Sequence, residues 1–381
     1  NHTITFLSRI GGLQQRGLLS YEAPQLFNSP NWKLTFTAFF DHTVEVTTFT
    51  SQRLEGVSQA EQVIARKADG SSSAVLDYRF NYRFVRAFLN RNNNFIPEEI
   101  PLLSQPVRLG EPGFSYIRNH RDNDLETTRG SYITVDAGVA SSYFGSQADF
   151  SHILVQNSTY HSFGKRRGST KELVLARSTR VGVESPFANT IITLPGFTPP
   201  ANQTQIPLPE RFFMGGGNSH RGFGLNQAGP RDPLTGFPLG GGGLFLNNIE
   251  LRFPPPTLPF VQDNMSFAIF HDMGNIFTDG RHILDSLLHW KQDKSSCTQP
   301  LNSPQNKSPF AAGSGAALCN YNYISQALGV GIRYKTPVGP VRFDLGYNLN
   351  PTVFPNFSRS VFVGTRQTSP FNIYFSIGQT F

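Results

Sequence analysis

Hydrophobic and polar residues alternate with a period of two along much of this chain, the pattern of β-strands with one apolar and one polar face. One face of residues 78–88 carries Tyr78, Phe80, Tyr82, Phe84 and Phe88, and the opposite face carries Asp77, Arg79, Asn81 and Arg83. Residues 341–349 repeat the arrangement, with Arg342, Asp344 and Asn348 on the polar side. Charged and amide side chains in the middle of successive strands indicate a wet side, as in the lumen of a membrane barrel.

Counting the alternating segments predicts about fourteen strands. They are expected near residues 2–10, 17–25, 32–41, 51–66, 74–90, 106–119, 130–141, 148–161, 171–184, 243–253, 264–276, 325–336, 340–349 and 371–381. Many of these lengths suit tilted strands that cross a bilayer, which need roughly nine to eleven residues each. A soluble all-β protein also alternates, but it would have to hide its aromatic residues between sheets. We therefore predict an all-β fold, a transmembrane antiparallel β-barrel.

The predicted connections between strands differ in length in a regular way. Short ones lie at residues 163–168 and 335–340, and long ones at residues 185–242, 277–324 and 350–370. Short periplasmic turns and long external loops are typical of outer-membrane barrels. An even number of strands that starts on the inside places all three long loops on one side, so the expected topology is self-consistent.

Composition supports this interpretation and excludes others. The 381 residues include 35 Gly and 34 Phe, and only 15% of them are charged. No run of eighteen apolar residues is present, so a transmembrane helix is excluded. The formal net charge of +7 is spread along the chain without a basic helix or a nucleic-acid motif, so we do not expect nucleic-acid binding.

The two cysteines, Cys297 and Cys319, lie in one polar segment rich in Gly, Ser and Pro. This pattern allows a loop disulfide formed in an oxidising compartment, and it also allows two free thiols. We expect the disulfide, in the external loop between the strands that end near Ile276 and begin near Ile324.

No catalytic constellation stands out in the sequence. Residues 217–220 (Gly-Asn-Ser-His) lack the spacing of a nucleophile elbow, and the glycine run lacks the lysine of a phosphate-binding loop. His271 and Asp272 are adjacent on a predicted strand, so they point to opposite faces and cannot easily share a metal ion. We therefore expect no enzyme, no metal site and no cofactor, and we expect His271 to face lipid or the interface.

Residues 211–223 (Arg-Phe-Phe-Met-Gly-Gly-Gly-Asn-Ser-His-Arg-Gly-Phe) interrupt the strand pattern. Glycine permits positive φ and close backbone approach, so such a loop can fold tightly. A lone arginine inside it, Arg221, then requires a carboxylate partner. An isolated Arg-Gly-Phe triplet is more commonly part of a solvated surface loop. Its context decides between the two interpretations.

That context is a series of motifs in the last two thirds of the chain. They are Glu-Arg-Phe-Phe-Met-Gly-Gly at 210–216 with Arg-Gly-Phe at 221–223, Asn-Ile-Glu-Leu-Arg-Phe-Pro at 248–254, Phe-His-Asp-Met-Gly at 270–274, Gly-Val-Gly-Ile-Arg-Tyr at 329–334 with Thr-Pro-Val-Gly-Pro-Val-Arg-Phe-Asp-Leu-Gly at 336–346, and a terminal Ile-Gly-Gln-Thr-Phe. Their order and spacing resemble the barrel of the outer-membrane assembly factor BamA family, which includes TamA and the two-partner secretion transporters. Singly, each motif is weak.

The resemblance implies that the loop carrying Arg221, Gly222 and Phe223 folds back into the lumen, where Arg221 contacts Asp272 and also Glu250. Alternation along the two strands agrees, because it places both carboxylates on the polar side. Breaking such a pair, if it is fully buried, costs about 3–5 kcal/mol. The resemblance also implies the bacterial cell outer membrane as location. The implied partners are outer-membrane lipids and lipopolysaccharide, unfolded client proteins, and accessory lipoproteins or periplasmic chaperones.

Two departures from the family pattern concern the extent of the barrel. The family carries POTRA domains before a sixteen-stranded barrel, whereas residues 1–381 read as barrel throughout, with about fourteen strands. Residues 19–32 resemble the second periplasmic turn of the family. We therefore expect a C-terminal portion that lacks the POTRA domains, with residues 185–242 forming the long loop. Loss of the first two strands of the family barrel is a second expectation, which stays open at this point.

Two functions remain open within this family. In an insertase, the seam between the first and last strands opens sideways and templates client strands, because unpaired edges accept new strands. The last strand would run from Phe371 to Phe381, with Gly378 weakening it and Phe381 at the periplasmic interface. In the alternative, a two-partner-secretion pore, the lumen exports an unfolded partner. The long Gly-rich loop favours the insertase, and that loop with its carboxylates argues against a passive porin.

Overall fold

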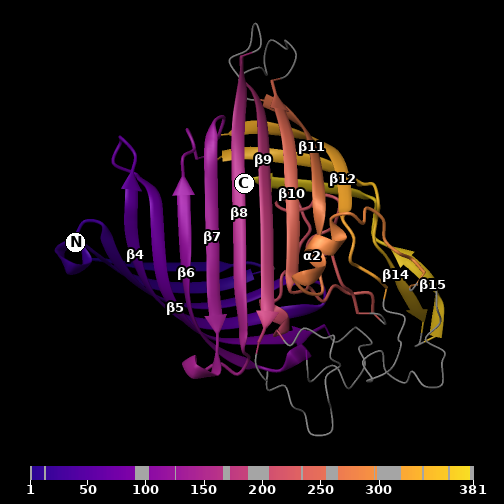
Figure 1. The fold of residues 1–381 in the computed structure, drawn as a ribbon, viewed down its shortest axis with the longest axis horizontal. Helices are drawn as coiled ribbons and strands as arrows, with labels where there is room; N and C mark the ends of the chain where they lie inside the picture. The colour runs from indigo at the N-terminus through magenta and orange to yellow at the C-terminus, as the bar shows by residue number, and fades with distance from the viewer. Residues whose placement is uncertain are drawn as a thin grey trace.

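The computed structural model describes residues 2–12, 14–90, 103–124, 126–165, 172–187, 206–232, 235–254, 265–295, 297, 319–336, 339–358 and 361–377. Fourteen strands form one antiparallel sheet, in which each strand lies beside the next strand of the chain except that β16 lies beside β13 (Figure 1). They are β1 (Thr3–Ile10), β2 (Gln14–Pro24), β3 (Trp32–Val46), β4 (Phe49–Arg66), β5 (Ser72–Leu89), β6 (Val107–Asn119), β7 (Gly130–Ala140), β8 (Phe150–Lys165), β9 (Glu172–Pro186), β10 (Gly243–Phe253), β11 (Met265–Phe277), β12 (Ser325–Thr336), β13 (Gly339–Asn348) and β16 (Phe371–Ile377). Every predicted strand is present, so the all-β antiparallel fold is confirmed.

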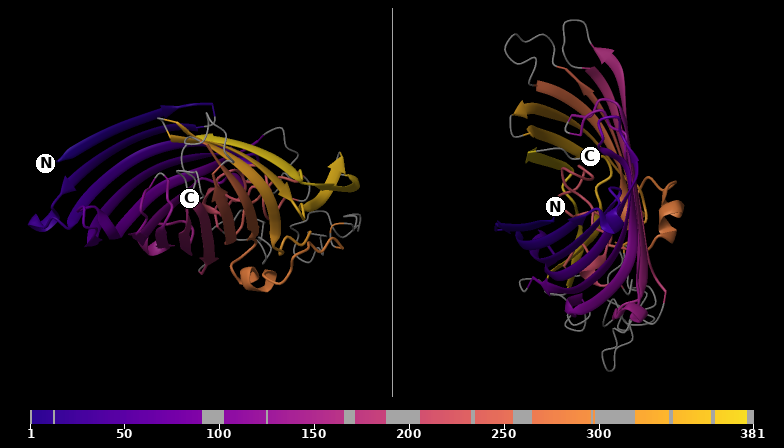
Figure 2. Two further views of the ribbon diagram at one scale, coloured as in Figure 1. Left: turned by 90° about the horizontal axis from the view of Figure 1, so that it is seen from above. Right: turned by 90° about the vertical axis from the view of Figure 1, so that its left-hand side faces the viewer.

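The sheet is strongly curved, and its two ends are the first and last strands (Figure 2). β1 pairs with β2, and β16 pairs with β13. Within the described residues, no pairing joins β1 to β16. In the part of the chain that the structure describes, the sheet therefore ends at β1 on one side and at β16 on the other.

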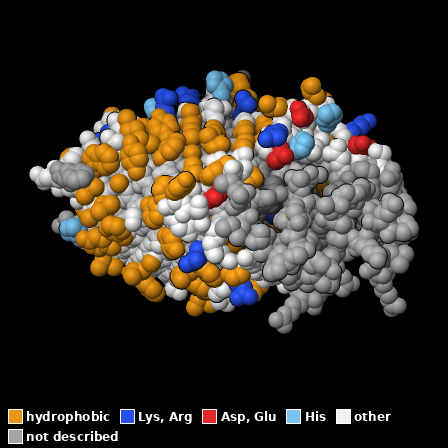
Figure 3. Space-filling view, turned by 60° about the horizontal axis from the view of Figure 1, so that its bottom comes forward, with side chains coloured by type: hydrophobic (Ala, Val, Ile, Leu, Met, Phe, Trp, Pro, Cys, Tyr) orange, Lys and Arg blue, Asp and Glu red, His pale blue; other side chains and the backbone are white. Residues whose placement is uncertain are grey.

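The two faces of the sheet differ as the alternation predicts. The convex face exposes apolar side chains, among them Phe80, Phe84, Ile269, Val330 and Phe343. The concave face buries charged and amide groups, among them Glu55, Arg83, Glu111, Asp272 and Asp344. Viewed with the loop end turned forward, the surface shows a broad band of hydrophobic side chains (Figure 3). Inverted polarity of this kind suits a sheet with lipid outside and a polar interior.

The long connections contain structure that the strand pattern did not predict. Residues 350–370, expected to be a loop, hold the hairpin of β14 (Val353–Ser358) and β15 (Val361–Gln367), a separate two-stranded sheet. This hairpin escaped notice because its strands are short and Pro355 interrupts the pattern. Residues 277–324 include helix α2 (Arg281–Ser286). Short 3-10 helices lie at Leu26–Asn28 (η1), Ser142–Phe144 (η2) and Leu208–Glu210 (η3). No helix in the described ranges is both long and apolar enough to span a bilayer.

The Gly-rich segment, described over residues 206–232 and 235–242, lies on the concave face of the sheet. Two isolated bridges, Phe212 with Gly241 and Arg231 with Pro238, fold it back on itself. Its apolar side chains Met214 and Phe223 pack with Leu244 and Leu246 of β10 and Ile276 of β11. At its other end Leu208 packs with Phe49 and Ala87 of β4 and β5. The segment thus spans the concave face from β4 and β5 to β11.

Candidate functional site

Arg221 is a buried arginine whose guanidinium reaches two carboxylates on the concave wall. Its side chain is 1% exposed. Nε and Nη2 donate to the two oxygens of Asp272 at 2.8 and 2.7 Å, and the backbone N–H of Arg221 donates to Asp272 at 2.9 Å. Nη1 donates to Glu250 at 3.0 Å. The guanidinium also lies over the Phe270 ring, 3.4 Å from its centroid. A planar fork that binds one carboxylate with two hydrogen bonds is a geometry that arginine provides and lysine does not.

Further charges extend this site into the network that we call the Arg221 cluster. Glu250 accepts hydrogen bonds from Arg252 at 2.7 Å and from Arg333 at 2.6 Å. Asp344 accepts from Arg342 at 2.7 Å and lies 3.4 Å from Nη1 of Arg221. The cluster therefore combines Arg221, Arg252, Arg333 and Arg342 with Glu250, Asp272 and Asp344. Opposite charges on β10 to β13 surround the one arginine that the loop contributes, so a buried charge is compensated on several sides.

Burial and charge act in opposite directions on Arg221. Burial alone would lower the pKa of its guanidinium, but the nearby charges of Asp272, Glu250 and Asp344 raise it above the ordinary value. Arg221 is thus charged throughout the accessible pH range. His220 beside it behaves differently, because burial lowers the pKa of its ring. Nδ1 of His220 accepts from the N–H of Gly222 at 3.1 Å, which leaves Nε2 to donate to the carbonyl of Ser325 at 3.2 Å. A neutral histidine fits that pair of contacts.

Gly222 and Phe223 bring the loop close to the sheet. A Cβ on Gly222 would lie 2.7 Å from the Cβ of Ala327 on β12, so only glycine permits this approach without displacement. The wall has its own glycine: a Cβ on Gly346 of β13 would lie 2.2 Å from the carbonyl oxygen of Arg221. Phe223 is fully buried and packs against His220, with ring centroids 5.0 Å apart. Shape as well as charge therefore fixes this part of the loop.

The same tripeptide binds the last strand of the sheet. The carbonyl of Gly222 accepts hydrogen bonds from Asn348 of β13 at 2.9 Å and from Asn372 of β16 at 3.0 Å. The hydroxyl of Tyr374 on β16 donates to the carbonyl of Phe223. The loop thus holds β16, the strand at the open edge.

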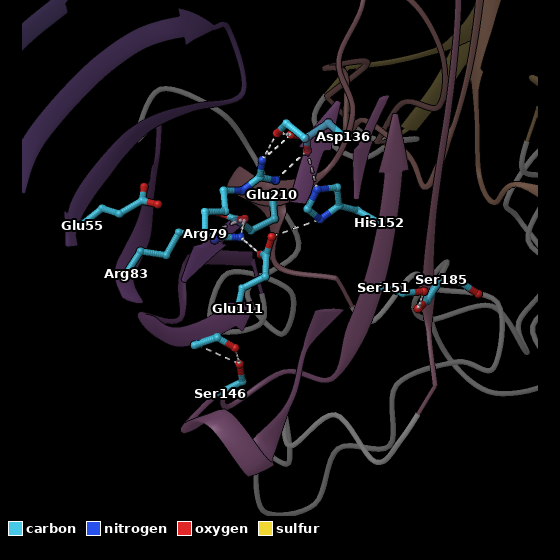
Figure 4. Close-up of polar contacts among 12 residues, drawn as sticks. Glu55, Arg79, Arg83, Glu111, Asp136, Ser146, Ser151, His152, Ser185 and Glu210 are labelled. Atoms are coloured by element: carbon cyan, nitrogen blue, oxygen red, sulfur yellow. Dashed lines mark hydrogen bonds and ion pairs between the residues drawn. The ribbon is translucent and has the colours of Figure 1, made fainter. Parts of the chain in front are cut away.

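A second polar cluster anchors the other end of the loop, and we call it the Glu210 cluster (Figure 4). Glu210 of η3 accepts hydrogen bonds from Arg53 of β4 at 2.7 Å and from Arg83 of β5 at 3.0 and 2.5 Å. Arg83 also donates to Glu111 of β6 at 2.5 Å. Burial would raise the pKa of Glu210, but the charges of Arg83 and Arg53 and their hydrogen bonds lower it to about 2. Glu210 is therefore ionised at neutral pH.

The Glu210 cluster continues along the concave wall through a histidine. His152 of β8 lies 3.3 Å from Glu111 through Nδ1 and 2.9 Å from Asp136 of β7 through Nε2. Arg79 of β5 donates to Asp136 at 2.7 Å. Figure 4 shows these side chains converging from neighbouring strands. The whole chain of contacts stiffens β5 to β8 against the loop. Within the described ranges, no group of three or more His, Cys, Asp or Glu residues is arranged to hold a metal ion.

The remaining residues named from the sequence fall in three places. Phe371, with Ile373 and Phe375, is exposed on the convex face of β16. Gly378 and Phe381 lie outside the described residues. Cys297 and Cys319 form a disulfide with Cα atoms 4.6 Å apart, and they pack with Tyr321 and Phe354. His271 lies on the convex face and contacts Gln326 at 3.3 Å.

Sequence reasoning missed several members of both clusters. Alternation places Arg342 and Asp344 on a polar strand face but does not connect them with Arg221, because the pairing register of β11 to β13 is not visible in a single sequence. Glu210 lies in a sequence motif that indicates no partner for it. A signal was available, since Arg83 sits in the middle of a polar strand face and has to meet a carboxylate.

Comparisons with known proteins agree with this architecture. The whole chain, residues 1–381, matches the Omp85 superfamily domain. A SAM50-like protein of Schizosaccharomyces pombe is 25% identical over 146 residues, which are 38% of this chain and 26% of that protein. Among solved structures, BamA from Haemophilus ducreyi lacking POTRA domains 1-3 has a TM-score of 0.66 at 12% identity, covering 98% of this chain and 64% of that chain. CdiB from Acinetobacter baumannii has a TM-score of 0.46 at 12% identity, covering 94% of this chain and 50% of that chain.

Proposed function

The chain belongs to the Omp85 superfamily, a family of outer-membrane β-barrels that insert or transport proteins, and on that premise we propose that it inserts client β-barrel proteins into the membrane. Client strands would pair with the edge strands β1 and β16 before release into the bilayer. The chain spans 26% of the SAM50-like relative and 64% of the BamA structure, so clients and partners belong to this proposal.

The two edge strands of the described sheet are the observation that supports the proposal. Among the described residues, β1 and β16 each pair with one strand, and all eight residues of β1 are exposed. An edge strand presents a row of N–H and C=O groups that can template another strand. In a membrane, unpaired backbone groups cost several kcal/mol each, so an incoming strand gains free energy by pairing there.

The loop supports insertion over export. It occupies the concave face and holds β16 through Asn372 and Tyr374. A pore for an unfolded chain needs this space to be free, whereas a templating edge needs its last strand held in position. The alternative, a two-partner-secretion pore, therefore requires release of both the Arg221 cluster and the Glu210 cluster.

A seam tether distinguishes the two functions. Cysteines replacing Phe6 on β1 and Ile373 on β16, both exposed on the convex face, are cross-linked with a bismaleimide, which leaves the Cys297–Cys319 disulfide untouched. We expect the cross-linked protein in vesicles to lose insertion of an added client barrel, measured as the folded, heat-modifiable client. Each single-cysteine variant should keep it.

A tether within the sheet serves as the control. Leu18 of β2 and Phe39 of β3 are already opposite each other, so linking cysteines at these positions should leave insertion unchanged. Full insertion by the seam-tethered protein would contradict templating at the edge. Export of a partner that persists through the tethered protein would favour the pore.

The proposal also places the protein in the outer membrane of a Gram-negative bacterium. The partners that fit it are unfolded client proteins delivered by periplasmic chaperones, accessory lipoproteins, and the surrounding lipid and lipopolysaccharide. We propose no catalytic role for the chain.

A further inference from the structure

Helix α2 covers the convex face of the sheet at the loop end of β9, β10 and β11 (Figure 2). Its buried Ile283 and the adjoining Leu287 pack with Val181 and Val183 of β9, Phe245 of β10 and Met273 of β11. The helix therefore takes the place that lipid or water would otherwise have on this part of the outer surface.

The opposite side of this segment is apolar and exposed. Leu284 is 74% exposed, Leu288 is 88% exposed and Trp290 is 63% exposed. Leu284 lies in α2 and Leu288 lies two residues beyond its last residue, Ser286, so both are near the same end of the helix. Three large apolar side chains within seven residues, all exposed, require an apolar partner.

The convex face beneath the helix indicates how deep that partner lies. Exposed apolar residues in the middle of the strands, such as Ile249 and Ile269, are followed towards the loops by polar ones. These polar residues are joined across the strands: Arg177 and Thr179 donate to Asn247, and His271 contacts Gln326. Such a row is where a hydrocarbon layer ends and the headgroup layer begins, because unsatisfied polar groups are avoided in hydrocarbon.

Helix α2 sits directly beyond this row. Phe245, which the helix covers, is two residues further along β10 than Asn247, or about 7 Å of strand. Amphipathic helices at a bilayer surface bury their apolar side chains roughly 5–10 Å deep at the boundary of headgroups and acyl chains. Tryptophan prefers the same layer, because one edge of its ring can stay hydrated.

We propose that the segment from Arg281 to Trp290 is an interfacial anchor that inserts Leu284, Leu288 and Trp290 into the headgroup layer of the outer leaflet. Its partner is the lipid surface itself. Charges in the surrounding segment balance, with Arg281, Lys291 and Lys294 against Asp279, Asp285 and Asp293, so apolar insertion and not net charge supplies the attraction. The anchor would fix the depth and tilt of the β9–β11 side of the barrel.

The inference can be tested with the native fluorescence of Trp290, because the chain has only two tryptophans. In a Trp32→Phe background, the full chain is reconstituted into phosphatidylcholine vesicles whose acyl chains are brominated either near the headgroup or near the methyl end. We expect a blue-shifted Trp290 emission that is quenched more strongly by bromine near the headgroup, and that is protected from iodide in the buffer.

Two variants test whether Leu284 and Leu288 are responsible for the position of Trp290 in the lipid. Replacing Leu284 and Leu288 together by Asp should expose Trp290 to iodide and weaken quenching by lipid, while Ile283 and Leu287 keep the helix packed. Val363→Asp, an equally polar change on exposed β15, should alter neither signal. Iodide quenching without lipid quenching in the parent protein overturns the proposal. So does strongest quenching by methyl-end bromine, or an unchanged signal in the double variant.

Discussion

At the scale of single residues, Arg221 uses the special shape of its side chain. Nε and Nη2 bind the two oxygens of one carboxylate, Nη1 binds another, and the flat face rests on Phe270. An ammonium group carries its three donors on a single nitrogen, so it cannot form the parallel pair with one carboxylate and also reach the second carboxylate in this geometry. The identity of the residue, and not merely its charge, therefore holds the loop on the wall.

Two substitutions of Arg221 should lower the free energy of unfolding to different extents. Arg221→Ala leaves Asp272 and Glu250 buried without their partner and should lower the free energy of unfolding by about 3–5 kcal/mol. Arg221→Lys should recover only part of that loss. Urea denaturation in detergent micelles, followed by heat-modifiable mobility, measures both values. Arg129→Lys, at a side chain that is 64% exposed, is the matched control and should be neutral. Equal stability of the Lys variant and the parent would contradict the role of the fork.

At the scale of elements, the strands were predictable and the contacts between the loop and the strands were only partly so. Alternation is a local property, so each strand such as β5 or β13 shows it without reference to its partners. Asp272 and Glu250 could be assigned to the concave face on the same basis, and the resemblance supplied Arg221 as their partner. Glu210 could not be assigned, because its partners Arg53 and Arg83 lie 157 and 127 residues earlier and nothing local connects them.

Close contact between the loop and β13 requires a glycine at position 346, because any side chain there would meet the loop. Gly346→Ala would place a Cβ 2.2 Å from the carbonyl oxygen of Arg221, so the loop has to shift away from the wall. We expect a loss of about 1–3 kcal/mol, the usual cost of overpacking, and faster proteolysis within residues 206–232. Gly56→Ala on β4 is the control, since a Cβ there meets no atom within 4 Å. If the loop stays protease-resistant in the Gly346→Ala variant, β13 shifts to accommodate the new methyl group and the loop does not have to move.

At the scale of the whole molecule, one loop connects two distant parts of a single sheet. The Glu210 cluster holds it to β4, β5 and β6, and the Arg221 cluster holds it to β10–β13. The loop also holds the edge strand β16 through Asn372 and Tyr374, whereas the described contacts of the loop do not include β1. The loop therefore stiffens the sheet from β4 to β16 and leaves β1 outside the anchored region.

The Glu210 anchor should respond to acid in a defined window. Its pKa falls from the ordinary 4.5 to about 2 in the folded protein, so the stability that it contributes is present above pH 4.5 and is lost as the pH falls towards 2. We expect the stability difference between the parent and Glu210→Gln to be constant near neutral pH and to shrink across that window. Urea titrations at a series of pH values measure it. A difference that does not change with pH would mean that the charge of Glu210 is not what binds Arg53 and Arg83.

The position of the loop within the chain also sets an order of events. The partners of Glu210 precede it, whereas Glu250, Asp272 and Asp344, which bind Arg221, all follow it. When strands pair in chain order, the first anchor can close as soon as residue 210 arrives, and the second must wait for the whole C-terminal half. The last ties, from Asn372 and Tyr374, form only when the final strand is in place. Docking of Arg221 therefore requires the strands up to β13, and only the additional contacts of Asn372 and Tyr374 report that the last described strand is also in place.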